Sequence, residues 1–593
     1  MMIGIHYLIF SQFFPNAQGK LGHDYQYNLP LLLDGYYWFL NNGFLSVPWF
    51  TPSFCGGMPL LPNPATFYVS TAQFFTFFVD PLTSVRLSLL LFAGLGFWGF
   101  YLLLSRIFKT GIWTALLGGT IFLFNGLYAY RFVVGHMEFH AFMLTPLVAF
   151  LLLKGESTTD QRLRRWHVAR NIVCCSLLVS YAFMSGMTQL IVPSLIAAMV
   201  AALVAKLESG HEVDLKQALL RLILAGVGAL GLSAAKLVAA MSFLGNFPRD
   251  SYLLPGVDSL GKLLSLIVES LSMGGIGIDS QSVIANSQWS LDRHEFEFGL
   301  TLVPFLLITA GVLLNFRHWR QGAAKIFCAR QLPYLTLTVF LLAIPLLLNY
   351  YSPSWNHFLK TIPFIKNLSN FFRWFIIYIP FLVIMAALAV EKTGILHQFS
   401  PYVAAIGMLL VVTQNLLTDK EFYHAQPYDP YAIVAAYQET QGKGHPPVIS
   451  RQVVSQDEFG QSTLAMGRND ALAKGGSQLL CYEPMFGFRL EFLPFKSIHP
   501  GPVLAESDGL LNLKNPACYL YPDENRCTPG DHFRVDEKGS AEQFISFHPF
   551  PYKKSGLQQA ADWLNMLFLL ALPALAIAYG LAVVQARRRL RGG

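Results

Sequence analysis

The sequence predicts an α-helical polytopic membrane protein with about twelve transmembrane helices and a small β-rich extracytoplasmic domain near the C-terminus. Three observations predict this class. Only 13% of the 593 residues are charged, against about 25% in soluble globular proteins. Apolar runs of the length that crosses a bilayer, about 20 residues, recur along the chain. One long polar stretch, 418–558, interrupts them. This composition excludes a soluble enzyme, a disordered scaffold and a nucleic-acid-binding protein that relies on basic patches.

The apolar runs divide the chain into its expected membrane helices. In chain order they are 2–14, 85–105, 111–130, 138–153, 171–186, 188–205, 218–242, 299–315, 332–350, 372–390, 400–417 and 560–584. The first run is short, and no cleavage site of the Ala-x-Ala type follows it. We therefore interpret it as a retained helix and not as a signal peptide.

The distribution of Lys and Arg predicts the orientation of these helices. Basic residues gather in alternate loops, as in 162–170 and 587–591, whereas the long loop 15–84 contains only Lys20. Because positively charged loops stay in the cytoplasm, both termini are expected there. The net charge of +7 is then mostly a topology signal and does not indicate a nucleic-acid partner.

Three parts follow from this topology. Residues 1–417 form a transmembrane bundle with an interfacial first outer loop (15–84), residues 418–558 form a soluble outer domain, and residues 559–593 form the last transmembrane helix with a basic cytoplasmic tail. Short strand-like runs and Gly or Pro turns in 418–558 favour a β-rich fold.

The cysteines are expected to differ in redox state along the chain. Cys518 and Cys527 flank a turn-rich stretch on the oxidising side, which favours a disulfide between them. Cys55 and Cys481 lie on the same side and are either free or paired. The remaining cysteines, expected in or beside the cytoplasmic half and reduced, are Cys174, Cys175 and Cys328.

Asp24 is the first candidate for chemistry, because it follows the first helix in the outer loop. A carboxylate at the membrane surface acts as a general base or binds a metal when its pocket is polar. The alternatives are an N-cap for an amphipathic helix that begins near Pro30, or simple solvation. Asp34, within that helix, is expected on its solvated face.

The second outer loop, 131–137, brings several ionisable residues together in a short stretch. His136 and Glu138 are possible ligands, with Asp24, of a divalent metal ion such as Mn or Mg. Arg131 instead suits a phosphate-bearing ligand, and His140 extends the cluster. The alternative interpretation is a hydrogen-bonded capping cluster without a ligand.

The third and fourth outer loops end in further charged residues beside predicted spans. The third ends with Arg293, Glu295 and Glu297, and the fourth with Lys366 and Arg373. Cations at this depth are placed to neutralise a lipid-linked phosphate, although long basic side chains also extend to the interface without any ligand.

Common catalytic motifs are absent from the sequence. There is no Gly-x-x-x-x-Gly-Lys-Ser/Thr loop, no Gly-x-Gly-x-x-Gly after a strand, no His-Glu-x-x-His and no Gly-x-Ser-x-Gly. ATP hydrolysis, dinucleotide binding and serine hydrolysis therefore lack support.

Four stretches carry a family resemblance. They are Gly22-x-Asp24-x-x-Tyr27-Asn28-x-Pro30 with Gly43, Pro48-Trp49, Cys55-Gly56-Gly57-x-Pro59 and Asn63-Pro64; Gly135-His136 with Thr145-Pro146-Leu147; Glu295 or Glu297 with Phe298-Gly299; and Arg373 at the head of a span that ends before Glu391. In these residues, over roughly 15–400, the chain resembles the multispanning GT-C glycosyltransferases, and among them the bacterial YfhO-type proteins.

The resemblance implies a reaction and a location. An acceptor hydroxyl on a glycan, lipid or protein attacks the sugar C1 of a polyprenyl-phosphate-linked donor, with inversion, on the outer face of the bacterial inner membrane. It implies that Asp24 is the catalytic carboxylate. By their position and charge, the candidates to bind the donor phosphate are Arg131, Arg293, Lys366 and Arg373. The family places an acidic pair in the second outer loop, where this chain has His136 and Glu138.

Two other functions remain open from the residues alone. A transporter or flippase of lipid-linked glycans favours inverted repeats and charges at the membrane midplane, whereas this chain has no apparent repeat and its charges cluster at one face. A non-catalytic envelope assembly protein would use the outer domain to bind polysaccharide or protein.

Overall fold

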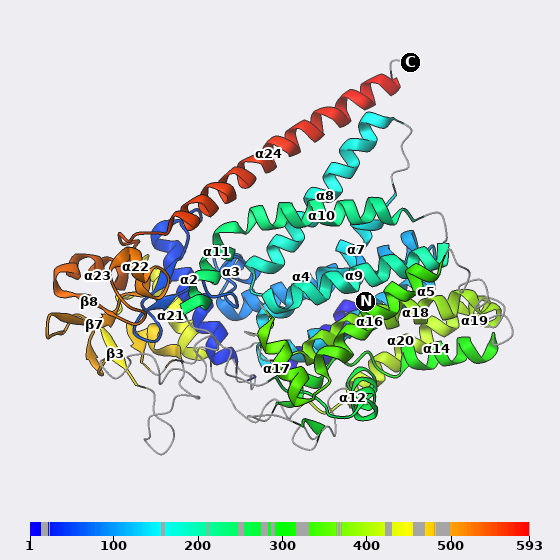
Figure 1. Ribbon diagram of the computed structural model, residues 1–593, viewed down its shortest axis with the longest axis horizontal. Helices are drawn as coiled ribbons and strands as arrows, with labels where there is room; N and C mark the ends of the chain where they lie inside the picture. The colour runs from blue at the N-terminus through cyan, green and yellow to red at the C-terminus, as the bar shows by residue number, and fades with distance from the viewer. Residues whose placement is uncertain are drawn as a thin grey trace.

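The structure is a computed structural model of the chain (Figure 1). It describes residues 1–13, 22, 24–155, 160–209, 213–246, 254–273, 283–285, 291–315, 331–362, 365, 368, 370–420, 430–454, 469–479, 481 and 498–591. In chain order the helices are α1 (Met2–Phe10), α2 (Tyr25–Asn42), α3 (Thr71–Phe75), α4 (Pro81–Leu102), α5 (Ile112–Leu123), α6 (Gly126–Val134), α7 (Thr145–Leu153), α8 (Gln161–Met184), α9 (Thr188–Ser209), α10 (Leu215–Leu232), α11 (Ala234–Asn246), α12 (Leu260–Ser272), α14 (Val303–Leu314), α16 (Leu332–Asn349), α17 (Pro353–Thr361), α18 (Tyr378–Lys392), α19 (Gly394–Gln398), α20 (Ser400–Leu417), α21 (Tyr431–Lys443), α22 (Pro522–Asn525), α23 (Lys538–Ile545) and α24 (Gly556–Arg591).

The described helices confirm a polytopic helical architecture. Nine helical segments among the described residues are long and apolar enough to cross a membrane: Pro81–Ile107, Ile112–Val134, Gln161–Met184, Thr188–Glu208, Leu215–Leu232, Leu332–Asn349, Phe372–Lys392, Ser400–Leu417 and Gly556–Gln585. Three further apolar helices, Met2–Phe13, Met137–Leu153 and Val303–Leu314, are shorter. Each matches an apolar run of the sequence, but the run 218–242 breaks at Ser233, between α10 and α11. Twelve crossings remain a prediction.

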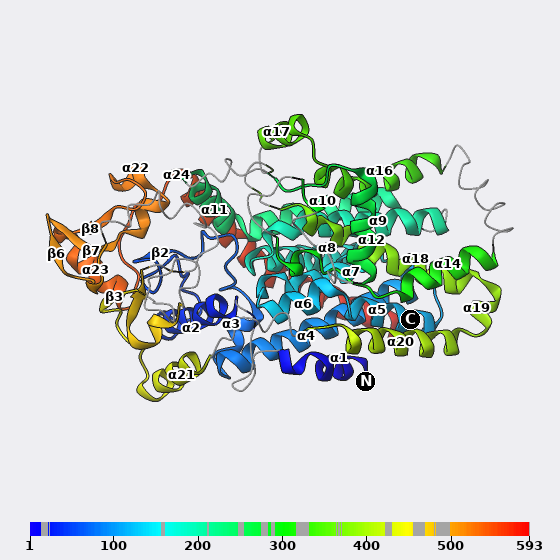
Figure 2. The same cartoon turned by 90° about the horizontal axis from the view of Figure 1, so that it is seen from below.

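The bundle has a packed centre and a periphery of uncovered apolar side chains. At its centre α5 packs against α4, α18 and α20, and α9 packs against α7 and α18 (Figure 2). At the periphery α24 leaves most of its apolar side chains uncovered, with Ile577 65% exposed. An uncovered apolar surface of this extent on a helix longer than a bilayer is thick is suited to contact with lipid.

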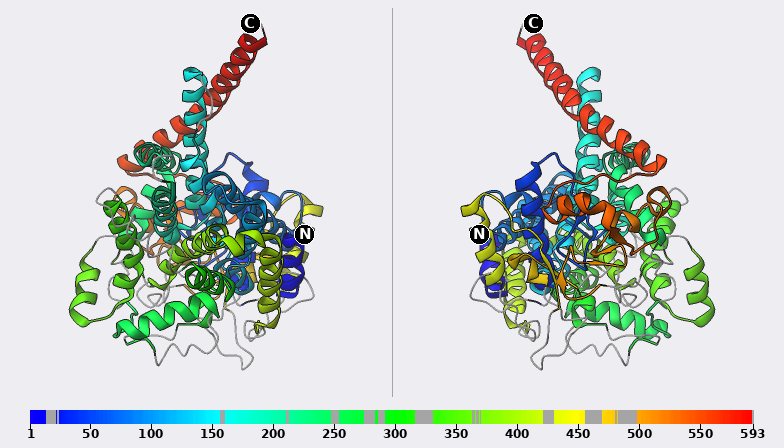
Figure 3. Two further views of the ribbon diagram at one scale, coloured as in Figure 1. Left: turned by 90° about the vertical axis from the view of Figure 1, so that its right-hand side faces the viewer. Right: turned by 90° about the vertical axis from the view of Figure 1, so that its left-hand side faces the viewer.

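The ends of α8 and α24 project from the body on the side away from the strands (Figure 1). Both helices project beyond the other helices, and α24 diverges from the body toward the C-terminus (Figures 1 and 3). Arg170 of α8 donates a hydrogen bond to the Tyr579 hydroxyl of α24 at 3.2 Å. The basic stretches 162–170 and 587–591 therefore lie on these two projecting helices, away from the strands.

The other end is a lobe built from two distant parts of the chain (Figure 1). One part is the first outer loop with α2, α3 and the strand pair β1 (Phe50–Thr51) and β2 (Met58–Pro59). The other part supplies two three-stranded sheets and the helices α21, α22 and α23. The sheets have the orders β4-β3-β5 and β6-β7-β8, with β3 (Arg451–Val453), β4 (Gly476–Gln478), β5 (Gly501–Pro502), β6 (Glu506–Ser507), β7 (Leu510–Lys514) and β8 (His532–Arg534). The described part of 418–558 is therefore mixed, with helices and short strands, where the sequence predicted a β-rich domain.

The two parts of the lobe are joined by covalent and backbone bonds. Cys55 forms a disulfide with Cys481, and Phe54 forms a parallel bridge with Gln478 of β4. The Lys514 amide donates to the Gly56 carbonyl at 2.8 Å. The first outer loop and the C-terminal segment therefore pack together as one unit.

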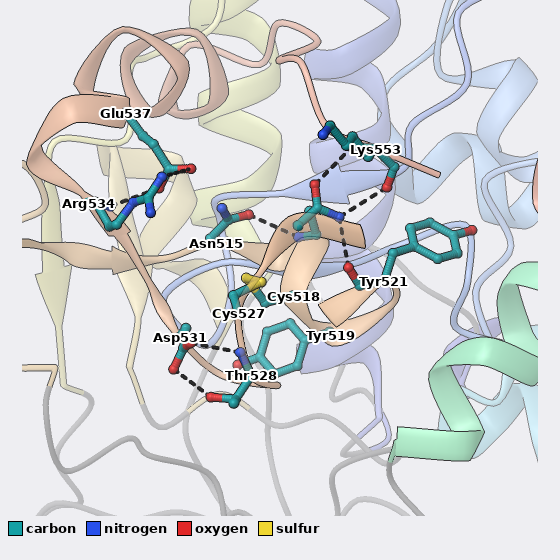
Figure 4. The surroundings of a disulfide bond; sticks show 12 residues. Asn515, Cys518, Tyr519, Tyr521, Cys527, Thr528, Asp531, Arg534, Glu537 and Lys553 are labelled. Atoms are coloured by element: carbon teal, nitrogen blue, oxygen red, sulfur yellow. Dashed lines mark hydrogen bonds and ion pairs between the residues drawn. A yellow bond between two sulfur atoms is a disulfide. The ribbon is translucent and has the colours of Figure 1, made fainter. Parts of the chain in front are cut away.

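The second disulfide, between Cys518 and Cys527, lies in the same lobe (Figure 4). It closes a short turn that Asn525 fixes from the other side, because its side chain donates to the carbonyls of Tyr521 at 2.8 Å and Lys553 at 3.0 Å. Cys174 and Cys175 on α8 are free thiols, and Cys328 lies outside the described residues.

The environment of Asp34 differs from the sequence prediction. The helix predicted around it exists as α2, but Asp34 is buried and not solvated. The hydroxyls of Thr51 and Ser53 donate to Oδ1, and that of Tyr68 donates to Oδ2 at 2.8 Å. The chain after α2 folds back over this face of the helix and supplies all three donors.

Candidate active site

A sharp turn after α6 positions the first functional side chains. The helix begins at the Asn125 cap, whose side-chain oxygen accepts from the Tyr128 amide at 2.9 Å, and it ends at Gly135, with φ +111°. Arg131 therefore lies on a helix and not in a loop as predicted. His136 follows the turn and precedes the 3-10 helix η3 (Met137–Leu144).

The start of α2 packs directly against this turn. The Asp24 amide donates to the Val134 carbonyl at 3.1 Å. A Cβ on Gly135 would lie 2.6 Å from the Tyr25 nitrogen, so only glycine permits this approach. The first outer loop is thereby fixed to the end of α6, and Asp24 is fixed beside His136.

The Asp24 carboxylate contacts the His136 imidazole, Oδ2 to Nε2. Asp24 occupies the N-cap position of α2, but its side chain makes no capping hydrogen bond in the described chain. The capping alternative from the sequence is therefore not realised, and the carboxylate is used in a contact between two outer loops.

The protonation of His136 follows from its neighbours. Burial lowers the pKa of His136, against the opposing effect of Asp24, so the ring is neutral at pH 7. A guanidinium nitrogen of Arg131 lies 2.8 Å from His136 Nδ1. Because arginine only donates, Nδ1 must accept, and the ring proton is on Nε2, facing Asp24. Asp24 is therefore held as the acceptor of a directed hydrogen bond.

Glu295 holds two arginines together beside this pair. It lies on η4 (Arg293–Phe296) and accepts from Arg131 in a bidentate pair at 3.1 and 2.8 Å. Arg373 Nε donates to Glu295 Oε2 at 2.9 Å, and the Asn370 amide donates to the same atom at 2.8 Å. Although burial alone would raise the pKa of Glu295, the two guanidinium groups hold it well below its usual value. Glu295 is therefore a buried, ionised anchor.

Arg373 is the more accessible of the two arginines. Its side chain is 16% exposed, whereas that of Arg131 is 1% exposed. Arg373 also donates to the Gln189 side chain at 2.6 Å. Both guanidinium groups lie 5.2 Å from the Phe139 ring centre, which fixes them on an aromatic surface.

Glu138 belongs to the same group of charged residues. It is near enough to Asp24, Arg131 and Arg373 to interact with their charges. Gly186 packs closely against Glu138, because a Cβ on Gly186 would lie 3.0 Å from the Glu138 Cβ. The cluster thus combines the carboxylates of Asp24, Glu138 and Glu295 with two arginines and His136.

Other predicted site residues lie elsewhere. Arg293 pairs with Glu297 and with Asp419, the latter at 3.3 Å. His140 lies between the Met137 carbonyl and the Tyr181 hydroxyl, each at 2.6 Å. Lys366 lies outside the described residues.

Sequence reasoning missed three members of the cluster. His294 stacks edge-on against His136, with ring centres 5.0 Å apart, and burial lowers its pKa to about 4. The Asn370 side chain donates a hydrogen bond to Glu295, and the Gln189 side chain accepts one from Arg373. Polar residues at the ends of apolar runs were the available signal, because such residues are expensive there unless they have partners.

The predicted metal ligands form an incomplete set. Within the described ranges, no three His, Cys, Asp or Glu side chains are arranged to hold a metal ion. Asp24 and His136 bind each other, and Glu295 accepts from two arginines and an amide. The use of Mn or Mg therefore stays a prediction from the sequence.

No protein-family model matches the sequence, and no curated protein matches it.

Proposed function

We propose that the protein is an inverting membrane glycosyltransferase that transfers a sugar from a polyprenyl-phosphate-linked donor to a glycan, lipid or protein acceptor of the cell envelope. One observation carries the proposal. Asp24, His136, Glu295 and Arg373 come from four segments that are far apart in the sequence, and they meet in one polar cluster beside the ends of apolar helices. These are the four stretches in which the chain resembles GT-C glycosyltransferases.

The proposed reaction uses Asp24 as the general base. The acceptor oxygen forms a bond to sugar C1, the bond from C1 to the phosphate oxygen breaks, and the electron pair leaves with polyprenyl phosphate. The acceptor proton passes to the Asp24 carboxylate. His136 is a positioning residue, because its Nε2 proton orients that carboxylate. A positioned base contributes about 10²- to 10⁴-fold in rate.

Arg373 is the proposed contact for the leaving phosphate. It is the partly exposed guanidinium of the cluster, and charge that develops on a leaving phosphate is stabilised by such a fixed cation. Arg131 and Glu295 hold Arg373 in place through their shared ion pair.

We also propose that the lobe faces the outer side of a bacterial inner membrane and that both termini are cytoplasmic. Two features support this orientation. Both disulfides lie in the lobe, and disulfides persist in oxidising compartments. The basic stretches lie on the projecting ends of α8 and α24, away from the lobe (Figure 1), as expected for cytoplasmic segments.

The first experiment is a transfer assay with Asp24→Asn. Purified full-length protein is incubated with a panel of polyprenyl-phosphate sugars, and bound lipid and released polyprenyl phosphate are followed by mass spectrometry. Asp24→Asn should bind the donor that the wild type binds but release product at least about 100-fold more slowly. Asp34→Asn is the matched control, since it alters a buried carboxylate of the same segment outside the cluster.

Other outcomes would reject parts of the proposal. Normal turnover by Asp24→Asn would remove Asp24 from the mechanism. Binding of one donor by both proteins without turnover, in the presence of candidate acceptors, would favour transport of the lipid-linked glycan. No binding across the panel would favour an envelope assembly protein.

A further inference from the structure

A groove separate from the Asp24 cluster opens between the lobe and the outermost helices. It has a volume of about 640 Å³. One wall comes from α2 and the chain that follows it, including Phe39 and Trp49, and the other from α8, α10, α11 and α24. Most of its lining is apolar, including Leu232, Met566 and Leu569. A hydrocarbon chain fits such a wall without loss of hydrogen bonds.

Lys236 on α11 places an amino group in this apolar groove, and burial lowers the pKa of that group to about 7. It is 1% exposed, and its Nζ donates to the Thr66 carbonyl at 2.8 Å and to the Met184 carbonyl at 2.9 Å. An ammonium group has three donors, so one donor remains for a ligand. Among the described residues no carboxylate pairs with Lys236, because Asp562, which lines the same groove, pairs with Lys554 at 2.7 Å.

The ammonium form of a buried lysine without a counter-ion is unfavourable, and an anion supplied by a ligand would stabilise that form. We propose that this groove binds a phosphate-bearing lipid of the surrounding bilayer, with a hydrocarbon chain along the apolar wall and the phosphate at the Lys236 ammonium. This inference does not depend on glycosyl transfer.

The mouth of the groove has the residues of a membrane interface. Lys554 lies 4.0 Å above the Trp49 ring, and tryptophan and lysine both favour the level of lipid headgroups. The α24 side of the groove continues into the uncovered apolar surface of that helix, where Leu567 is 64% exposed. A bilayer lipid can therefore enter sideways from the membrane.

The position of Lys236 favours a bilayer lipid over the sugar donor. The segments that bind its amino group, at Thr66 and Met184, are continuous with Ala65 and Gly186, which pack against each other. Gly186 also packs against Glu138. Among the described residues, no hydrogen bond joins Lys236 to Asp24 or Glu138. A phosphate at Lys236 would therefore be separated from the Asp24 cluster by these two segments. The bound lipid would stabilise the segments and would not take part in the reaction.

The test is lipid retention by the purified full-length protein. Delipidated protein in detergent is mixed with phosphatidylglycerol or with diacylglycerol of the same acyl chains, and both retention and thermal unfolding are measured, the first by native mass spectrometry. Phosphatidylglycerol should be retained and should raise Tm, whereas diacylglycerol should not. Lys236→Met should weaken retention at least tenfold, and Lys236→Arg should preserve it.

Two further variants separate a local effect from a folding defect. Lys206→Met is the matched control, because Lys206 also donates to a backbone carbonyl, that of Val213 at 2.8 Å, but lies outside the groove; it should retain lipid as the wild type does. Met566→Trp should block the groove while Lys236 remains, and it decides the question if Lys236→Met does not fold.

Three results would overturn the inference. They are equal retention by folded Lys236→Met and wild type, equal retention of diacylglycerol and phosphatidylglycerol, and unchanged retention by Met566→Trp. Displacement of phosphatidylglycerol by an equimolar amount of polyprenyl phosphate would assign the groove to the donor instead. Failure of the transfer assay leaves each of these outcomes unaffected.

Discussion

At the residue scale, Asp34 shows how packing overrides a local pattern. The helical pattern of 29–40 placed this carboxylate on a polar face, which correctly predicted a helix and wrongly predicted solvent. The lobe covers both faces of α2, so the carboxylate is buried and receives three hydroxyl donors. Burial raises the pKa of Asp34 to about 6, although these hydrogen bonds oppose the shift.

This shift predicts a pH-dependent stability. A carboxyl whose pKa is higher in the folded chain than its ordinary 3.8 favours folding when it is protonated, and that contribution is lost as pH rises from about 4 through about 6. Asp34→Asn mimics the protonated form, so it should match the wild type at pH 4 and be more stable at pH 7.5, by about 3 kcal/mol at most. Thermal unfolding of both proteins across this range measures the difference. A constant difference at all pH values would show that ionisation of Asp34 is not involved.

At the element scale, the turn between α6 and η3 determines the site. Its Gly135 has φ +111°, and a Cβ there would meet backbone atoms of Asp24 and Tyr25 within 3 Å. Gly135→Ala should therefore destabilise the protein, by on the order of 2 kcal/mol, and should slow transfer because it moves Asp24 away from His136. Unfolding and transfer assays on the same preparation measure both effects.

The matched control is Gly226→Ala in α10. No atom lies within 4 Å of the Cβ position there, so alanine should leave transfer unchanged and stabilise the helix slightly, by roughly 0.5–1 kcal/mol. If the two variants behaved alike, close packing at Gly135 would not be what holds Asp24 in place.

The membrane helices could be predicted because their signal, an apolar run, is local in the sequence. Apolar runs mark helices because each span must be apolar along its own length, and every described span coincides with such a run. The lobe was not predictable in the same way, because its Gly and Pro turns suit short helices as well as strands. The contacts of Glu295 with Arg131 and Arg373 join residues 164 and 78 positions apart, and no local pattern encodes such pairs.

At the scale of the whole molecule, the lobe depends on joining the first outer loop to the C-terminal segment. Cys55 and Cys481 are 426 residues apart, whereas Cys518 and Cys527 are nine apart. Besides the first disulfide, Asn41 and Asn42 of α2 donate to the carbonyls of Ser546 and Phe547 at 2.9 and 2.7 Å. Since Asp24 begins α2 and these contacts end it, the lobe holds the helix that carries the proposed base.

Loss of the longer disulfide should therefore affect both stability and transfer. A crosslink restricts the unfolded chain more when it closes a longer loop, so replacing Cys55 and Cys481 by Ser should destabilise the lobe by on the order of 5 kcal/mol, against about 2–3 kcal/mol for the Cys518 and Cys527 pair. Limited proteolysis in detergent, which detects opening of the lobe, measures both double variants beside the wild type. Only the first variant should also lose transfer, because only that disulfide joins the two parts around α2. Equal protease sensitivity and equal transfer in the two variants would mean that the noncovalent contacts of α2 suffice to hold the base in place.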